Sequence, residues 1–287
     1  MKLTLYHDIN SFYWDVYGIL MRHESQNVIP LGNVIIGHAG KDKTGWRDTA
    51  DWLMATVSDS AGIRLTAVMT PPFQLTLYAT DNQNDAAALV CLVEGIANTR
   101  FSVPGVMSEQ SLAQSFAQTY TAVRGVHHTV QKHMRLYELS RVNPDIPHVD
   151  VRLTRESDMA FLPYWIEGFG LDCQLPQDVK LDGDNARYEI AAKRIYVLED
   201  NGTPVCITKM SREMQTVCGI GHVYTPPYFR NRGYATSCVA AVSRLVLERG
   251  FTRSILYTDL ANPTSNSIYR KIGYTPISDA MEITFET

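Results

Sequence analysis

A short basic turn at residues 229–236, Phe-Arg-Asn-Arg-Gly-Tyr-Ala-Thr, constrains the fold of this 287-residue chain more than any other segment. It follows an apolar run that ends in Thr-Pro-Pro at 225–227, and it leads into a helical pattern over 235–250. A strand, a glycine-containing turn and a helix start together form an anion site, because the helix N-terminus presents unpaired N–H groups and the positive end of the helix dipole. The segment therefore predicts a phosphate or pyrophosphate site.

The residue types in this turn agree with that prediction. Gly233 lets the backbone approach an anion closely, and the small Ala235 keeps the first helical turn open. Arg230 and Arg232 add charge that pairs with phosphate oxygens. The chain has neither Gly-x-x-x-x-Gly-Lys-Ser/Thr nor a Gly-x-Gly-x-x-Gly that follows a strand, which excludes the two best-known phosphate loops.

A second motif follows the turn at a short distance. Residues 254–258 predict a buried strand, and the segment 259–274 predicts a short helix that Asn262 or Thr264 caps. Asn266 and Tyr269 are three residues apart and hence lie on one face of this helix.

Taken in this order and at this separation, the two motifs resemble the GNAT superfamily of acyl-CoA-dependent N-acyltransferases over residues from about 150 to 287. The resemblance implies a mixed, mostly antiparallel sheet that splays open between its fourth and fifth strands. Acyl-CoA, most simply acetyl-CoA, lies in that opening as the co-substrate, and no metal takes part. The acyl group passes by direct attack to a primary amine of a small molecule or peptide.

Two alternatives to this activity remain open. One is a non-catalytic acyl-CoA-binding or regulatory protein that kept the phosphate site. The other is an acyltransferase of the glycine-conjugating type, which uses larger acyl groups and also pairs a divergent N-terminal region with a GNAT domain.

The resemblance assigns roles to particular residues of this chain. Tyr269 is the general acid, whose hydroxyl reaches the sulfur of CoA, and the alternative is a helix-face aromatic that packs on the core. Asn262 and Asn266 either hold the pantetheine arm or cap the helix. The acyl-CoA contacts that the resemblance implies are at Val223, Tyr224, Thr225, Arg230, Asn231, Arg232, Gly233, Tyr234, Ala235, Thr236, Asn262 and Asn266.

The general base is left open. Some family members carry a carboxylate on the strand before the phosphate turn, but residues 218–222 read Cys-Gly-Ile-Gly-His and contain no acid. His222, Glu213, Glu167 and Tyr224 are the alternatives, together with a water chain to a more distant acid.

Composition limits the partners. The net charge of -4 argues against general nucleic-acid binding, and no apolar stretch is long enough for a membrane span. The five cysteines are scattered, without metal-ligand spacing, as in reduced cytosolic proteins. We therefore expect a cytoplasmic monomer or homodimer that acts on a small-molecule or peptide amine.

Two prolines at 143–148, Asn-Pro-Asp-Ile-Pro-His, predict a boundary between domains 1–143 and 149–287. In the first half, residues 48–58, 86–97 and 108–123 predict helices, and 127–139 predicts paired strands. This order loosely repeats the GNAT order, but the segment 78–85 has no glycine or arginine. We therefore expect an α/β (α+β) protein of two GNAT-like domains, each a twisted sheet flanked by helices, with a degenerate N-terminal copy.

Overall fold

A computed structural model describes residues 1–40, 48–80, 85–175 and 179–286 of the chain. The chain divides into two compact units, called unit 1 and unit 2 below. Unit 1 comprises Met1–Leu136, Thr258–Ala261 and Pro276–Thr287, and unit 2 comprises Tyr137–Tyr257 and Asn262–Thr275. This division differs from the cut expected at 143–149, because the C-terminal segment belongs to unit 1.

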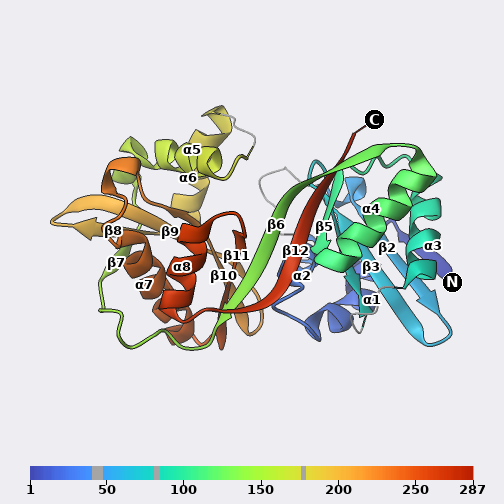
Figure 1. Cartoon of the computed structure of the whole chain (residues 1–287), viewed down its shortest axis with the longest axis horizontal. Coiled ribbons are helices and arrows are strands. Elements are labelled where there is room, and N and C mark those ends of the chain that lie inside the picture. The colour runs from blue at the N-terminus through green and yellow to red at the C-terminus, as the bar shows by residue number, and fades with distance from the viewer. Residues whose placement is uncertain (41–47, 81–84, 176–178, 287) are drawn as a thin grey trace. The chain divides into compact units, whose positions relative to one another are not determined.

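Unit 1 is a mixed, mostly antiparallel sheet with helices on both faces (Figure 1). Its strand order is β1-β2-β3-β4-β5-β12-β6, with β4 and β5 parallel. The strands are β1 (Lys2–Tyr6), β2 (Leu53–Asp59), β3 (Gly62–Met69), β4 (Leu75–Ala79), β5 (Gly105–Glu109), β6 (His127–Leu139) and β12 (Thr275–Glu286), of which β6 ends in unit 2. The helices are α1 (Ile9–Met21), α2 (Val28–His38), α3 (Ala86–Ala97) and α4 (Gln110–Arg124).

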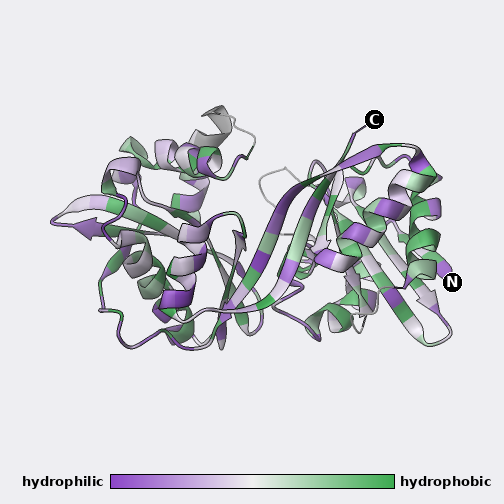
Figure 2. Ribbon diagram, in the orientation of Figure 1, coloured by the Kyte–Doolittle hydropathy of each residue, from purple (hydrophilic) through white to green (hydrophobic). Residues whose placement is uncertain are grey.

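Strand β2 is buried along most of its length because unit 1 covers both faces of its sheet. Leu53, Ala55 and Val57 pack into one core with α3 and α4. Met54 and Thr56 are buried on the other face, where α1 contacts the sheet. Figure 2 shows α3 as hydrophobic along most of its length, while α4 carries both hydrophobic and hydrophilic stretches.

The helix predicted over 48–58 is wrong. The Asp48 side chain accepts a hydrogen bond from the Ala50 backbone N–H at 2.9 Å, as at a helix start, but only a 3-10 turn, Thr49–Asp51, follows. The next residues form β2, because an apolar run buried on both faces has no periodicity that separates strand from helix. The segment 127–139 is one long strand, β6, and not a pair. The helices expected at 86–97 and 108–123 correspond to α3 and α4.

Part of the segment 78–85, where we expected no phosphate site, lies outside the described residues.

Unit 2 has the strand order β6-β11-β10-β9-β8-β7, with α5 and α6 on one face and α7 and α8 on the other. Its remaining strands are β7 (Val151–Leu153), β8 (Ile195–Asp200), β9 (Thr203–Glu213), β10 (Val217–Tyr224) and β11 (Arg253–Asp259). Its helices are α5 (Leu162–Asp172), α6 (Val179–Ala192), α7 (Tyr234–Glu248) and α8 (Pro263–Ile272).

The sheet of unit 2 opens where the resemblance placed the opening. Strands β10 and β11 are parallel, and they pair through Val217, Cys218 and Gly219 opposite Arg253, Ser254 and Ile255. Both strands continue past the last of these pairs. The N-terminus of α7 follows the free end of β10, so the opening lies beside the predicted phosphate turn.

Candidate functional site

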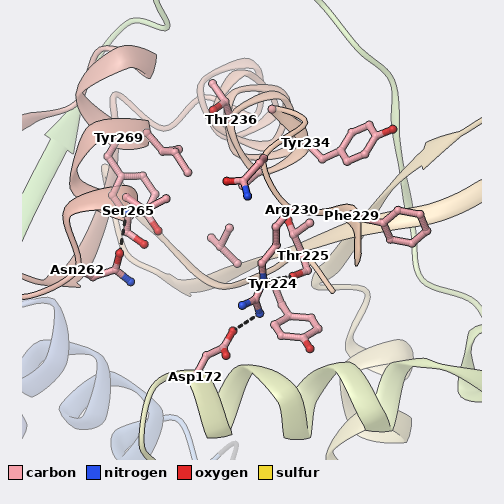
Figure 3. A pocket seen from close by; sticks show the side chains of 16 residues that line it. Asp172, Tyr224, Thr225, Phe229, Arg230, Tyr234, Thr236, Asn262, Ser265 and Tyr269 are labelled. Carbon is pink, nitrogen blue, oxygen red and sulfur yellow. Dashed lines mark hydrogen bonds and ion pairs between the residues drawn. The ribbon is translucent and has the colours of Figure 1, made fainter. Parts of the chain in front are cut away.

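A cavity of about 610 Å³ lies within unit 2 between the end of β10, the start of α7 and the start of α8. Figure 3 shows side chains from these elements directed into one space, with the last residue of α5 on its far side. Its lining residues are Asp172, Val223, Tyr224, Thr225, Phe229, Arg230, Asn231, Gly233, Tyr234, Ala235, Thr236, Asn262, Thr264, Ser265, Ile268 and Tyr269. Most of the residues predicted from the two motifs therefore lie around a single cavity.

The N-terminus of α7 opens onto this cavity without a side-chain cap. Gly233 is the N-cap residue, and its φ of 83° lies in the left-handed region that glycine adopts easily. A Cβ atom added at Gly233 would meet nothing within 4 Å among the described residues, so backbone conformation rather than crowding favours glycine here. The first N–H groups of the 15-residue helix remain available to an anion in the cavity.

Arg230 lines the cavity and contacts the end of α5. Its Nε donates to the backbone oxygen of Thr225 at 2.9 Å, and its Nη2 donates to Oδ2 of Asp172 at 2.5 Å. The guanidinium carbon lies 5.8 Å from the ring centre of Tyr224, which is within cation–π range. These contacts hold the guanidinium in place, and Figure 3 shows the Asp172 carboxylate beside it.

Strand β10 has a bulge where it reaches the cavity. Gly221 pairs with Lys209 and Tyr224 pairs with Ile207, so His222 and Val223 occupy an irregular step between these pairs. His222 has a φ of 48°, which is uncommon for a residue with a side chain. Such a bulge interrupts the ladder and leaves backbone groups unpaired. The backbone groups of Val223 and Thr225 are thus placed next to the cavity.

Tyr269 lines the cavity from α8, although only 7% of its surface is exposed. Its ring lies 6.0 Å from that of Tyr274 and 6.4 Å from that of Tyr137. Burial raises the pKa of the Tyr269 hydroxyl above its ordinary value of 10.0. The side chain therefore keeps its proton at neutral pH. Ser265, one helical turn earlier on the same face, lines the cavity as well.

The two asparagines of the second motif have different surroundings. Asn262 lines the cavity and also caps α8, since its Oδ1 accepts a hydrogen bond from the Ser265 backbone N–H at 3.0 Å. Asn266 does not line the cavity. Its Nδ2 donates to the Asn262 backbone oxygen at 2.7 Å, and its Oδ1 accepts from the Tyr137 hydroxyl at 3.0 Å. Asn266 thus joins α8 to the end of β6.

Arg232 also lies away from this cavity. It lines a neighbouring hollow of about 490 Å³ together with Asp200 and Tyr234, whose hydroxyl donates to the Asp200 carboxylate. Five residues that line the cavity were not predicted from the motifs: Asp172, Phe229, Thr264, Ser265 and Ile268. Helical spacing from Tyr269 could have identified Ser265, whereas nothing local in sequence links Asp172 to the turn.

The possible bases differ in their surroundings. His222 stacks on Phe169 with ring centres 4.6 Å apart. Burial, and then the charges of Lys209 and Arg194, lower its pKa from 6.5 to about 3, so its imidazole is neutral but weakly basic at pH 7. Glu213 is half-exposed and lies 3.7 Å from Arg249. Tyr224 lines the cavity, and burial raises its pKa.

Two absences hold for the described part of the chain. No group of three or more histidine, cysteine or acidic residues is placed to hold a metal ion there. None of its helices is both long and apolar enough to cross a lipid bilayer.

The chain is similar to known proteins in part of its sequence and in its fold. Residues 206–283 match the family described as FR47-like protein. A GNAT-family acetyltransferase from Colwellia psychrerythraea is similar with a TM-score of 0.65 and 11% identity, over all of both chains. A GCN5-related N-acetyltransferase from Sphaerobacter thermophilus has a TM-score of 0.62 and 12% identity, over 99% of this chain and 95% of that one.

A tandem GNAT protein from the clavulanic acid biosynthesis pathway is similar with a TM-score of 0.60 and 12% identity, over 99% of this chain and 98% of that one. No curated protein matches this chain. At these identities the comparisons concern the fold alone. The chain has the GNAT fold along its whole length, in agreement with the resemblance seen in its motifs.

Proposed function

We propose that this chain, which has the GNAT fold, is an acyl-CoA-dependent N-acyltransferase that transfers acetyl from acetyl-CoA to a primary amine. The observation that carries the proposal is the uncapped N-terminus of α7, which opens at Gly233 onto a cavity of about 610 Å³. A pyrophosphate at this point takes up the free N–H groups and faces Arg230. The fold supports acyl-CoA as the co-substrate.

The residues along the cavity fit the rest of such a substrate. The bulge at His222 and Val223 leaves backbone groups beside the cavity, where the pantetheine amides need partners. Asn262 and Ser265 add polar groups from the opposite wall, and Ile268 adds an apolar one. All of these residues belong to unit 2 and to the part of the chain that the structure describes.

In the proposed reaction a neutral amine attacks the thioester carbonyl carbon, so that a C–N bond forms and the C–S bond breaks. The amine loses a proton and the departing sulfur gains one. Tyr269 is the proposed proton donor to the sulfur, because it lines the cavity from α8 and its hydroxyl is protonated at neutral pH. The proposal assigns no base, and solvent accepts the proton from the amine.

One observation favours a second candidate function, a non-catalytic acyl-CoA-binding protein. Residues 218–222 contain no carboxylate, and the pKa of His222 near 3 makes this histidine a weak base. A protein that only binds acyl-CoA would need neither a base nor a proton donor at the sulfur.

Binding and turnover distinguish the two candidates. Purified protein is titrated calorimetrically with acetyl-CoA and longer acyl-CoAs, and thiol release is then followed with a panel of amines. We expect binding of acetyl-CoA and thiol release with at least one amine. Binding without thiol release on any amine would favour the second candidate, and no binding of any acyl-CoA at millimolar concentration would exclude both.

Two variants test the location of the site. Arg230→Gln should weaken acetyl-CoA binding roughly tenfold, because it removes a charge-assisted contact to phosphate worth about 1.5 kcal/mol. Arg270→Gln removes the same charge from an exposed position on α8 and should leave binding unchanged. Equal effects of the two variants would mean that the pyrophosphate binds elsewhere.

A further inference from the structure

Charged side chains gather on the face of the unit 2 sheet that α5 and α6 cover. Nζ of Lys209, on β9, lies 2.6 Å from Oε1 of Glu189, on α6. Arg194 holds the same carboxylate with two hydrogen bonds, from Nη2 at 3.0 Å and from Nε at 3.1 Å. We call Lys209, Arg194 and Glu189 the basic cluster. After burial, the charges of Lys209 and Arg194 contribute to the lowered pKa of His222, so this histidine lies near the cluster.

The basic cluster holds more positive charge than Glu189 balances. The Lys209 side chain is only 13% exposed, and an ammonium group has three N–H donors that are costly to bury without acceptors. Among the described residues the structure provides one hydrogen-bond acceptor for this ammonium group, the Glu189 carboxylate, which Arg194 also occupies. Burial lowers the pKa of Lys209, and the nearby charges of Arg194 and Arg212 act in the same direction. A bound anion would compensate this charge.

The cluster adjoins an open stretch of β10. Lys209 pairs with Gly221, so the two residues share one face of the sheet. A Cβ atom added at Gly221 would meet only the Ser211 Oγ, at 3.9 Å, within 4 Å among the described residues. As far as the described residues go, the strand surface beside Lys209 thus has room at Gly221.

This open stretch leads to the place where the proposed reaction occurs. The bulge of β10 begins at His222, and Val223 lines the acyl-CoA cavity. Two residues of strand span about 7 Å, so Gly221 lies within the length of a small molecule from the cavity wall. A ligand over Gly221 can contact the basic cluster with one end and reach toward the thioester with the other.

We propose that the acceptor is an amine that carries an anionic group, a carboxylate or a phosphate, and that Lys209 and Arg194 bind this group. The inference rests on the proposed function and specifies its substrate class. Arg194 is 32% exposed and can be reached by a ligand, and its Nη1, which makes no hydrogen bond to Glu189, has donors for an anion of either kind. Lys209 supplies the donors that Glu189 leaves unused.

Matched pairs of acceptors test this inference on the full chain. Amino acids are compared with their amides, and ethanolamine phosphate is compared with ethanolamine, with thiol release measured at saturating acetyl-CoA. We expect kcat/KM to be at least about tenfold higher for the anionic member of one series, the scale of a charge-assisted contact. The series that responds identifies the carboxylate or the phosphate.

Variants connect this preference to the cluster. Lys209→Gln should raise KM for the anionic acceptor roughly tenfold and leave the acetyl-CoA Kd unchanged, whereas Lys209→Arg should keep most of the preference. Lys271→Gln, at an exposed position on α8, is the control for net charge. If the circular dichroism spectrum of Lys209→Gln shows that it does not fold, Arg194→Gln takes its place, because its side chain is more exposed.

The outcomes distinguish failure of this inference from failure of the proposed function. Equal kcat/KM for anionic and neutral members of every pair, or a preference that Lys209→Gln and Arg194→Gln leave intact, overturns this inference while the acyltransferase assignment stands. Acetyl-CoA binding without thiol release on any amine overturns the proposed function, and the acceptor class with it.

Discussion

At Tyr269, burial and position act together on the chemistry that the hydroxyl can perform. The side chain lines the cavity, and its raised pKa keeps it protonated over the pH range in which amines begin to lose their protons. Ser265 and Asn262 lie on the same wall. A protonated hydroxyl on the cavity wall fits the proposed role of proton donor to the departing sulfur.

Tyr269→Phe tests that role. We expect kcat to fall on the order of a hundredfold, the usual contribution of a positioned general acid, with little change in the acetyl-CoA Kd. Tyr274→Phe is the matched control, because it removes a buried hydroxyl that bonds Ser243 and Ser254 outside the cavity lining. It should lower stability by about 1–2 kcal/mol without changing kcat. An unchanged kcat in Tyr269→Phe would remove this residue from the mechanism.

Asp172 places a negative charge on the wall of a cavity that we expect to bind a polyanion. Its ion pair with Arg230 joins side chains that are 48% and 40% exposed, so the pair adds little to stability. Asp172→Asn should tighten acetyl-CoA binding roughly fivefold at low salt, because an exposed charge interaction is worth about 1 kcal/mol, and salt should reduce the gain. Calorimetry at two ionic strengths measures it.

The control for Asp172→Asn is Asp184→Asn, which removes a similarly exposed ion pair with Arg187 on α6. It should leave acetyl-CoA binding unchanged. Weaker binding in Asp172→Asn would show instead that Asp172 positions Arg230 for the phosphate.

At the scale of single elements, the glycine-containing start of α7 carries the most information. Gly233→Ala should cost about 1 kcal/mol, because a Cβ atom strains a left-handed residue even where the structure has room for it. Gly202→Ala, in the turn between β8 and β9, has a φ of 77° and equal room, so it should cost about as much. Urea unfolding measures both.

Acetyl-CoA binding separates these two glycines. Only Gly233→Ala should weaken it, because only that Cβ atom would lie where the pyrophosphate approaches the helix N-terminus. If Gly233→Ala binds as tightly as the wild type, the phosphate does not lie against this turn.

The ion pairs of Arg152 join β7, the turn Glu156–Ala160 and β8, and they allow a prediction of how stability depends on pH. Arg152 makes two hydrogen bonds to Asp158, at 2.7 and 3.0 Å, and one to Glu199. Burial alone would raise the pKa of Asp158, but Arg152 and then Arg155 outweigh it through hydrogen bonds and charge, so the pKa lies below 3.8. A lowered folded-state pKa gives stability that is present above pH 3.8 and is lost as the pH falls through the folded-state value.

Asp158→Asn should therefore destabilise the protein by about 1.5–3 kcal/mol at pH 7, the scale of a hydrogen bond to a charged group, and flatten its acid unfolding. Thermal unfolding from about pH 2 to about pH 7, the range in which carboxyl groups titrate, measures both effects. Asp145→Asn, at an exposed position, is the control and should keep the wild-type profile. A steep acid limb in Asp158→Asn would place the titrating groups elsewhere.

The elements that were predicted correctly from the sequence are those whose conformation depends on residues close together in the chain. The Asn201–Gly202 hairpin forms with φ of 49° and 77°, because that dipeptide favours left-handed backbone. The turn that ends at Gly233 and the helix α8 are equally local, and their backbone conformations were predictable. The strand Leu53–Asp59 was mistaken for a helix, because burial on both faces removed its alternation. Asp172 was missed because only tertiary folding brings it to Arg230.

At the scale of the whole molecule, the sequence placed a boundary at the prolines of 143–148, but contacts far apart in the chain decide the units. Strand β12, which is close to α8 in sequence, pairs with β5 through Ala280–Thr284 opposite Gly105–Glu109. Met281 and Ile283 belong to the core of unit 1. No local pattern reports such a pairing, because its partner strand is more than half the chain away.

Removal of residues 276–287 should therefore unfold unit 1, although it deletes only the end of the chain. The backbone amides of β2, β3 and β4 should lose protection from hydrogen exchange, because β12 supplies the ladder partner of β5 and part of the core.

Ile283→Ala is the milder form and should lower the free energy of unfolding by about 2–4 kcal/mol, as a buried large-to-small change does. Val130→Ala, 41% exposed on β6, is the control and should change stability by less than about 0.5 kcal/mol. Protection that survives the truncation would mean that β1–β5 fold without β12, so that the cut near residue 143 describes the folding units better than the contacts do.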